Sequence, residues 1–361
     1  MSFKISCQGA TSIKAFVEFL WHKLIPAIST TIWNKMPSKM AGDIRATFPA
    51  FNGNRANLEK HILICLAEEE NFDNYCEYLH NPKYFFRNYI EKNIRIYFSG
   101  KGGEKMKTFL KISLDDIKNV ILSAIHESTA IVKDKRSTAS EWLDLFCDHL
   151  ENNLVFPRKD LVSIEHQEIN DIQFFKEVMS EALDPAMERV EQNCLSMSVE
   201  EMVPEIEKML SEHLCGCWKQ CPFCRAVCTN TIPAHEGDHS VFFHRPQAVI
   251  GSEWYTKMFN IRTKTDQFVI NTCSSSVASD SFLLLNNGSE ILYKNYREAG
   301  GDCALWSITP DSSMQPYWKW FVCHFRSNLE EKYQKKFTGK GKIPNAWAKI
   351  TKQDVLDDLK K

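Results

Sequence analysis

The stretch Cys221-Pro222-Phe223-Cys224 is followed within twenty residues by His235, His239 and His244. A Cys-x-x-Cys pair places two thiolates on one Zn²⁺, and a later pair of histidines completes a tetrahedral shell. The window from 215 to 244 holds eight residues of these two types: Cys215, Cys217, Cys221, Cys224, Cys228, His235, His239 and His244. This density predicts one structural zinc ion.

The two cysteines of the Cys-Pro-Phe-Cys run are the first-choice ligands, and the residues alone leave the other two positions open. His235 with His239 could close the shell, as could His239 with His244, and Cys228 could replace one histidine. We do not expect two metals, because eight ligands within thirty residues leave too little chain for interleaved loops. Without a metal, the window would be a cluster of free thiols and surface histidines.

A catalytic zinc site keeps one position open and commonly has a carboxylate nearby as general base. Glu236 and Asp238 are available for that role, and Asp238 could instead orient a ligand imidazole. His235-Glu-Gly-Asp-His239 has the letters of His-Glu-x-x-His, but Pro233 and Gly237 argue against the helix that this catalytic motif needs. The deaminase signature, a His-x-Glu followed by Pro-Cys-x-x-Cys, is absent, because Gln220 precedes Cys221. The pattern therefore favours a closed structural site and no catalytic residue.

The chain on the amino-terminal side of this window has the apolar spacing of helices almost throughout. We expect a helical domain, a bundle or stalk, over residues 1–214. Gly100 to Gly103 should break it, and Pro204 should kink its last helix. The helical spacing recurs at 57–80, 82–98, 114–133, 139–152, 170–182 and 199–213.

We place the zinc-binding module at 215–246. After it, the sequence pattern changes from helical spacing to a mixture of strand, turn and helix signals. Asn286-Asn287-Gly288 between two apolar runs predicts a β-hairpin, because Asn-Gly tolerates positive φ. We also expect a strand over 267–273 and helices over 316–334 and 352–360. The fold class is thus α+β: a helical region, a zinc knuckle, and a small hairpin-containing domain with flanking helices over 247–361.

Composition narrows the function classes. The formal net charge of −2 gives no global electrostatic case for nucleic-acid binding, and no apolar run approaches the length of a membrane span. Of the 13 cysteines, those outside the window are scattered through apolar or amphipathic sequence, which is typical of free thiols in a reducing compartment. We expect protein partners, and neither nucleic acid nor membrane.

Nucleotide binding can be tested on the residues directly. Thr263-Lys264-Thr265-Asp266 fits a short pattern that reads a guanine base. Such a site also needs a glycine-rich phosphate loop ending in Gly-Lys-Ser/Thr. Gly100 to Gly103 and Gly339 to Lys342 are the candidates, and neither has the spacing or the hydroxyl for magnesium. A polar loop before a strand is the better interpretation of residues 263–266.

Several short runs in the second half of the chain are specific in combination, although none is specific alone. They are Cys221-Pro-Phe-Cys224, Cys228, Asp238-His239, His244-Arg245-Pro246-Gln247, Asp311-Ser-Ser313, Tyr317-Trp-Lys-Trp-Phe321 and Ile343-Pro-Asn-Ala-Trp347. Together they resemble the carboxy-terminal part of the interferon-induced very large GTPases, and the resemblance extends over essentially the whole chain.

The resemblance implies a cytoplasmic protein, with the nucleus as a second expected location, linked to interferon responses and innate immunity. In that family the GTP-binding domain lies upstream of the matched region, so we expect a relative without its own nucleotide site. By analogy with the family, Cys221, Cys224, His239 and His244 are the zinc ligands, with Cys228 and His235 as alternates. The resemblance implies a non-enzymatic structural or interaction protein. One alternative is an accessory subunit that assembles with full-length family members. The other is a zinc enzyme or ubiquitin-ligase-like module.

Overall fold

The structure is a computed structural model, and it groups the chain into two compact units, each built from two separate stretches. It describes residues 10–132, 139–150, 153–154, 171–242, 244–251, 255–260, 265–270, 272–285, 288–311 and 315–360. Unit 1 comprises Met1–Asp43 and Ile94–Ile206, and unit 2 comprises Ile44–Asn93 and Glu207–Lys361. The linear division with boundaries at 214 and 246 stays a prediction, and the packing groups residues 44–93 with the carboxy-terminal part.

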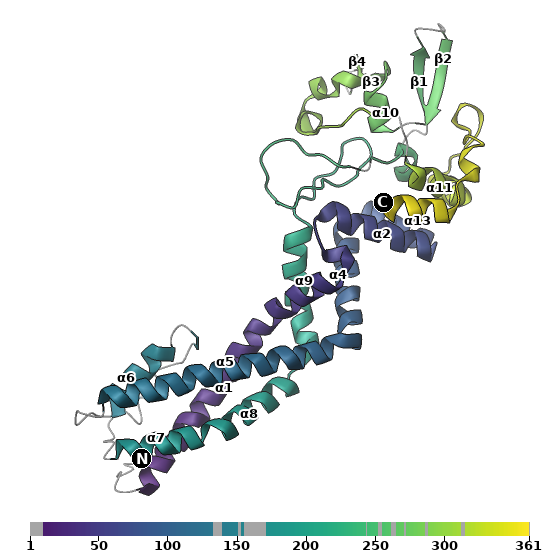
Figure 1. Cartoon of the computed structure of the whole chain (residues 1–361). Coiled ribbons are helices and arrows are strands. Elements are labelled where there is room, and N and C mark those ends of the chain that lie inside the picture. Colours follow the sequence, from purple (N-terminus) through teal and green to yellow (C-terminus); the bar gives the residue numbers. More distant parts are fainter. Residues whose placement is uncertain are drawn as a thin grey trace. The chain divides into compact units, whose positions relative to one another are not determined.

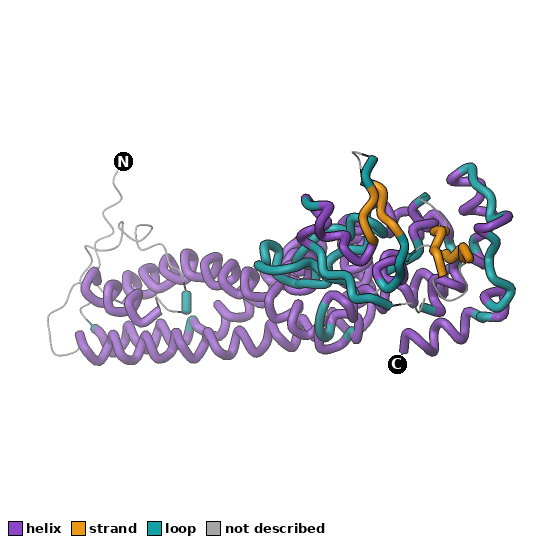
Figure 2. Tube along the Cα trace, turned by 90° about the horizontal axis from the view of Figure 1, so that it is seen from above, coloured by secondary structure: helices purple, strands orange, loops and turns teal. Residues whose placement is uncertain are grey.

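The described part of unit 1 is almost entirely helical, as the purple segments of Figure 2 show. Helix α5 packs against α6, α7 and α8. In its core, Trp142 stacks on Phe146 at 4.8 Å between ring centroids and meets Phe175 edge-on at 4.7 Å. The helices that contribute to this unit are α1 (Ala10–Thr47), α4 (Pro82–Tyr97), α5 (Gly103–Val132), α6 (Ala139–Leu150), α7 (Ile172–Glu181), α8 (Leu183–Ser196) and α9 (Val199–Leu214), with a π-helical turn at Phe98–Gly102 (Figure 1).

Unit 2 combines helices from both of its stretches with irregular chain. An aromatic core joins them: the hydroxyl oxygens of Tyr75 and Tyr317 lie 2.7 Å apart, and Tyr75 packs on Phe321 at 4.6 Å. Its further helices are α2 (Arg55–Glu69), α3 (Phe72–His80), α10 (Cys273–Val277), α11 (Pro316–His324), α12 (Arg326–Tyr333) and α13 (Lys352–Lys360). Short 3₁₀ turns lie at Pro49–Phe51, Gln247–Ile250, Tyr293–Ala299, Gly301–Leu305, Gly339–Gly341 and Trp347–Lys349.

Two antiparallel pairs of strands complete the described part of unit 2. Strand β1 (Tyr255–Asn260) pairs with β2 (Thr265–Ile270), and β3 (Phe282–Leu284) pairs with β4 (Glu290–Leu292). The second pair is the hairpin that the sequence predicted, although residues 286–287 of its turn lie outside the described residues. With helices before and after a Cys/His-rich segment and a hairpin, the predicted α+β fold class is confirmed.

Local chemistry moves several predicted boundaries. The helix expected over 57–80 is two helices, because Glu70 adopts a left-handed conformation (φ 49°) and Asn71 then caps α3 by accepting from the backbone N–H of Asp73 (2.9 Å). The helix expected over 316–334 likewise breaks at Phe325. Among the described residues, no helix is both long and apolar enough to cross a membrane.

Candidate metal centre

A tight hairpin over residues 217–228 positions four of the cysteines. The backbone N–H of Cys221 donates to the carbonyl of Ala226 (2.8 Å), and that of Cys228 donates to the carbonyl of Lys219 (2.8 Å). At the turn, Arg225 takes a left-handed conformation (φ 55°) and donates its N–H to the carbonyl of Cys221 (2.9 Å). The turn therefore presents Cys221 and Cys224, while Cys217 and Cys228 face each other at the base.

The first cluster, which we name the Cys₃His group, consists of Cys221, Cys224, His244 and Cys273. Its four candidate donor atoms all lie within 4.8 Å of one another, and its three cysteines are buried. They come from three segments: the turn of the hairpin, the chain after 243, and the first residue of α10. The side chain of Thr272 caps α10 by accepting from Ser275 N–H (3.2 Å), which fixes where Cys273 begins the helix.

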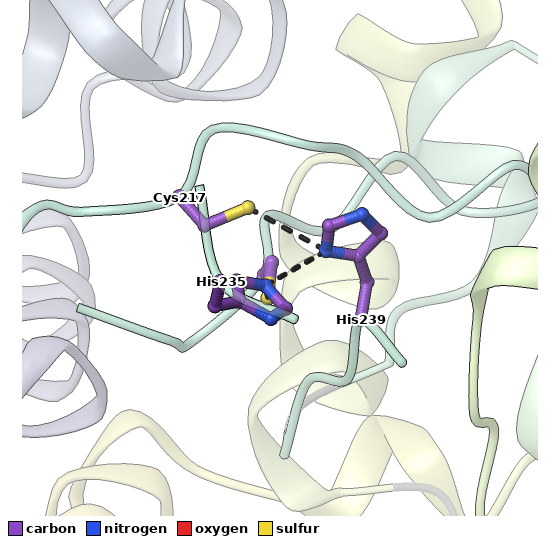
Figure 3. A group of neighbouring side chains, drawn as sticks. Cys217, His235 and His239 are labelled. Atoms are coloured by element: carbon purple, nitrogen blue, oxygen red, sulfur yellow. Dashed lines mark hydrogen bonds between the residues drawn. The ribbon is translucent and has the colours of Figure 1, made fainter. Parts of the chain in front are cut away.

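The second cluster, the Cys₂His₂ group, consists of Cys217, Cys228, His235 and His239. The two sulfurs come from the base of the hairpin, and the two imidazoles come from the loop that follows (Figure 3). His239 Nδ1 lies 3.5 Å from Cys217 Sγ and 2.9 Å from His235 Nε2, and His235 Nε2 lies 3.6 Å from Cys228 Sγ. His235 directs its other ring nitrogen to the carbonyl of Glu236 (3.2 Å).

The donor distances can be compared with a zinc tetrahedron. Zn–S and Zn–N bonds of usual length give edges of about 3.8 Å between two sulfurs, about 3.6 Å between sulfur and nitrogen, and about 3.4 Å between two nitrogens. In the Cys₃His group, Cys221 Sγ lies 4.0 Å from Cys273 Sγ, and Cys224 Sγ lies 3.4 Å from His244 Nδ1. The Cys273–His244 contact is shorter, at 2.8 Å, so a bound ion would spread that pair by about 0.8 Å.

A bound cation would stabilise the Cys₃His group, as the pKa shifts of its thiols indicate. Burial raises the pKa of the thiols of Cys221 and Cys273. At Cys224 burial acts in the same direction, but hydrogen bonds from Cys221, Cys273 and His244 outweigh it and hold the pKa well below its usual value. A divalent cation would stabilise all three as thiolates, so the residues fit a zinc ion.

The structure distributes the predicted ligands over both clusters. It brings Cys221, Cys224 and His244 together, and it places His239 in the other cluster with the two alternates, Cys228 and His235. The sequence predicted one cluster of ligands, and that ligand assignment stays a prediction; in the structure the sulfurs of one hairpin are divided between two clusters, and one donor comes from outside the window. The two clusters are interleaved along the chain, because Cys228, His235 and His239 lie between Cys224 and His244, and Cys273 supplies the chain length that the thirty-residue window lacks.

Two of the clustered residues were not predicted. Cys217 is separated from the Cys-Pro-Phe-Cys run by three residues, and only its symmetric partner Cys228 on the other side gave a signal. Cys273 was assigned to the end of a strand, which is wrong, because the strand ends at Ile270 and Cys273 begins a helix. Its distance from the window, 28 residues beyond His244 counting those in between, left no spacing to detect.

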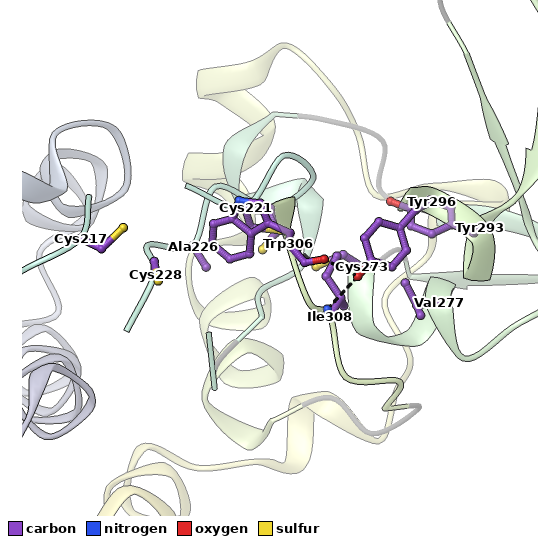
Figure 4. Close-up of a cluster of buried hydrophobic side chains, with 11 residues drawn as sticks. Cys217, Cys221, Ala226, Cys228, Cys273, Val277, Tyr293, Tyr296, Trp306 and Ile308 are labelled. Carbon is purple, nitrogen blue, oxygen red and sulfur yellow. Dashed lines mark hydrogen bonds between the residues drawn. The ribbon is translucent and has the colours of Figure 1, made fainter. Parts of the chain in front are cut away.

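Aromatic side chains enclose the clusters (Figure 4). Phe223, between the two cysteines of the turn, packs on Tyr293 at 4.9 Å and on Tyr296 at 5.9 Å. Trp306 packs on His239 at 5.6 Å. The hydroxyl of Tyr296 donates to the carbonyl of Trp306 (2.9 Å), which ties this wall together. The cysteines therefore belong to a small hydrophobic core.

Two buried arginines connect the Cys/His segment to helices of the first stretch of unit 2. Arg55, at the start of α2, donates to the carbonyls of Cys215 and Cys217 (2.9 Å for the latter), and its guanidinium lies 4.0 Å from the ring of Trp218. Arg245 follows directly after the candidate ligand His244 and lies over the ring of Tyr78 in α3 at 5.1 Å. Removing either cation would leave buried polar atoms or ring faces without a partner.

The acidic residues suggested for catalysis do not face the clusters. Asp238 makes a bidentate ion pair with Arg297, with N–O distances of 2.6 and 2.9 Å, so its carboxylate is engaged by a cation and not by a ligand imidazole. That pairing lowers the pKa of Asp238. The side chain of Glu236 is exposed, and only its carbonyl accepts from His235. Residues 263–266 fit a short pattern that reads a guanine base, and residues 263 and 264 of this run lie outside the described residues.

Comparison with known proteins identifies the region. Residues 217–359 match the family described as "Interferon-induced very large GTPase 1, C-terminal domain", and this match begins at the first candidate ligand and includes all eight. The chain is 71% identical over 360 residues to the human protein named "Interferon-induced very large GTPase 1" and 69% identical over 361 residues to the mouse protein of that name. Each comparison covers 100% of this chain and 14% of the relative, so the chain spans a small part of their length. No solved structure matches it. The chain therefore belongs to the interferon-induced very large GTPase family and corresponds to the carboxy-terminal part of its relatives.

Proposed function

We propose that this chain is a non-catalytic structural and interaction module, stabilised by zinc, of an interferon-induced very large GTPase. The observation that carries the proposal is the Cys₃His group, in which four donors from three separate segments converge within 4.8 Å. Three thiolates and one imidazole at tetrahedral spacing are typical of zinc.

The closed character of the group supports a structural role. Four protein donors fill a tetrahedral shell, and the burial of all three cysteines leaves no side for a water or a substrate. Zinc here would link the turn of the hairpin to the chain after 243 and to the start of α10. An isolated antiparallel β-bridge between Pro246 and Thr272 also joins two of these segments.

The arginine contacts extend this role to the helices. Arg55 holds the base of the hairpin against α2, and Arg245 fixes the chain beside His244 against α3. Zinc would thus hold irregular chain in the shape that these helices contact. We infer that the resulting surface serves protein partners, full-length family members among them, in the cytoplasm and also in the nucleus. The net charge of −2 supports protein partners rather than nucleic acid.

A ubiquitin-ligase-like module is the second candidate, since the structure brings together a second cluster of four donors. The donors of the two clusters alternate along the chain: Cys221 and Cys224 lie between Cys217 and Cys228, and the other two donors of the Cys₃His group follow His239. This interleaved order supports the second candidate. GTP binding is named for the relatives, and we assign none of it to the residues of this chain.

The proposal is tested by zinc content and thermal unfolding of the full chain. Cys273→Ser should lose one zinc equivalent and lower the melting temperature, because the remaining three donors no longer close the shell. Cys215→Ser is the matched control: Cys215 is also buried, at 2% exposed, and belongs to neither cluster. Equal zinc content in wild type, Cys273→Ser and Cys215→Ser would reject the proposed site.

A further inference from the structure

We propose that the Cys₂His₂ group, Cys217, Cys228, His235 and His239, is a second zinc site whose ion exchanges more readily than the ion of the Cys₃His group. This inference rests on the proposed function in that both clusters are assigned to zinc. It stands on different residues and on a separate observation, the way in which the loop after the hairpin is held.

That loop has almost no apolar anchor of its own. Residues 231–240 are all described, and the side chains of Ile232, Pro233 and Ala234 are exposed. Apart from Thr231 at the start of the loop, the half-buried residues in it are His235 and His239. A loop that turns two imidazoles inward and its apolar residues outward gains little from burial. A metal on the inward residues supplies the missing stabilisation.

The hairpin offers the other two donors in a fixed position. Cys217 N–H donates to the carbonyl of Asn230 (2.9 Å), which ties the base of the hairpin to the beginning of the loop. Gly216 packs so closely on the backbone of Thr231 that an added Cβ would lie 2.0 Å from its carbonyl carbon. The start of the loop is therefore fixed relative to both sulfurs, and His235 then needs only four residues to reach them.

The end of the loop is fixed as well. His239 donates its backbone N–H to the carbonyl of Leu305 (2.8 Å) and accepts from Ser307 N–H (2.8 Å), so it is held like a residue of a short parallel bridge beside Trp306. The carbonyl of Glu236 orients the ring of His235, an outer contact typical of metal-bound histidine. Both imidazoles thus face the sulfurs from preorganised positions.

The two sites should differ in exchange because their surroundings differ. Three donors of the Cys₃His group are buried thiols, whereas half of the Cys₂His₂ group is imidazole on an exposed loop. Zinc with two thiolates and two neutral imidazoles carries no net charge, and chelators can approach it from the side of the loop. The zinc ion of the Cys₂His₂ group should therefore dissociate first.

The test uses the purified full chain loaded with zinc, and measures metal content together with release to a colorimetric chelator. We expect two zinc ions per chain and two release phases. His235→Ala should leave one zinc and abolish the faster phase, with affinity at this site weakened at least about tenfold. Glu236→Ala is the control, because it keeps the carbonyl that orients His235 and should retain both ions.

A second variant and substitution of zinc by Co²⁺ distinguish the loss of this one site from misfolding of the chain. Cys228→Ser should also leave one zinc, and Co²⁺ bound to it should retain the intense thiolate charge-transfer band of the Cys₃His group. One zinc in wild type that survives His235→Ala and is lost in Cys273→Ser would overturn this inference and leave the proposed function intact. Two ions in both wild type and His235→Ala would overturn the ligand assignment. Absence of zinc from wild type would reject both proposals.

Discussion

The two compact units solve the same problem, a stable interior, by different means. Unit 1 buries apolar side chains of long helices, such as Leu24 of α1 and Trp142 of α6, both fully buried. The interior around the hairpin of unit 2 is instead made of thiols with Tyr296 and Trp306 (Figure 4). Helices satisfy their own backbone groups, so unit 1 needs only an apolar stripe. Irregular chain lacks that repeat, and the interior of unit 2 contains instead the Cys and His side chains that could hold a metal ion.

Removal of zinc should give the largest difference in stability between the two units. Metal binding contributes on the order of 10 kcal/mol to folding in structural zinc sites. After chelation we expect rapid hydrogen exchange over residues 217–251, while the amides of α5 in unit 1 stay protected. Hydrogen exchange followed by mass spectrometry, before and after chelation, measures both at once.

The control for this experiment is the same chain given an excess of zinc after chelation, which should restore protection. If protection over 217–251 persisted in metal-free protein, the interior of unit 2 would be stable on its own packing. The contrast between the units would then be one of composition only.

Truncation of a side chain in the core of unit 1 should lower stability without changing the zinc content. Trp142→Ala removes a ring packed on Phe146 and Phe175 and should lower the free energy of unfolding by about 3–5 kcal/mol. Zinc content should not change, since Trp142 and the donors belong to different units. Denaturant unfolding paired with metal analysis tests this, and the exposed neighbour Glu141 provides Glu141→Ala as a control.

We expect a smaller effect on stability at Glu330 in α12, a part of unit 2 that is stabilised by ion pairs and not by a metal. Glu330 accepts from the backbone N–H of Phe337 (3.0 Å) and pairs with Arg326 and Lys336, which together lower the pKa of Glu330 to about 2. A carboxylate with a lowered pKa stabilises the folded state above its unfolded pKa, and this contribution fades as pH falls toward the folded value.

Glu330→Gln should therefore be less stable than wild type at pH 7, and the difference should shrink between about pH 4.5 and pH 2. Thermal melts across this range, with Glu331→Gln as the neighbouring control, measure it. A difference that grew on acidification would show that Glu330 acts through packing and not through its charge.

The helical part of the fold was predictable because its period is local. Apolar spacing gave the positions of α4, α6 and α7 to within a few residues, and the missed breaks at Glu70 and Phe325 depend on single backbone conformations that the period does not encode. The hairpin was predictable from Asn-Gly. The sorting of donors into two clusters was not, because Cys273 reaches its partners only through the tertiary fold, and His239 lies at a similar spacing from His235 and from His244.

The division of unit 2 into two stretches has a consequence for how this polypeptide acquires its shape during synthesis. Helices α2 to α4 are synthesised well before the Cys/His segment, yet Arg55 meets the carbonyl of Cys217, 162 residues later. Contacts so distant in sequence form slowly, because a long loop must close first. We therefore expect the aromatic faces of these helices to stay uncovered while the intervening helices are translated.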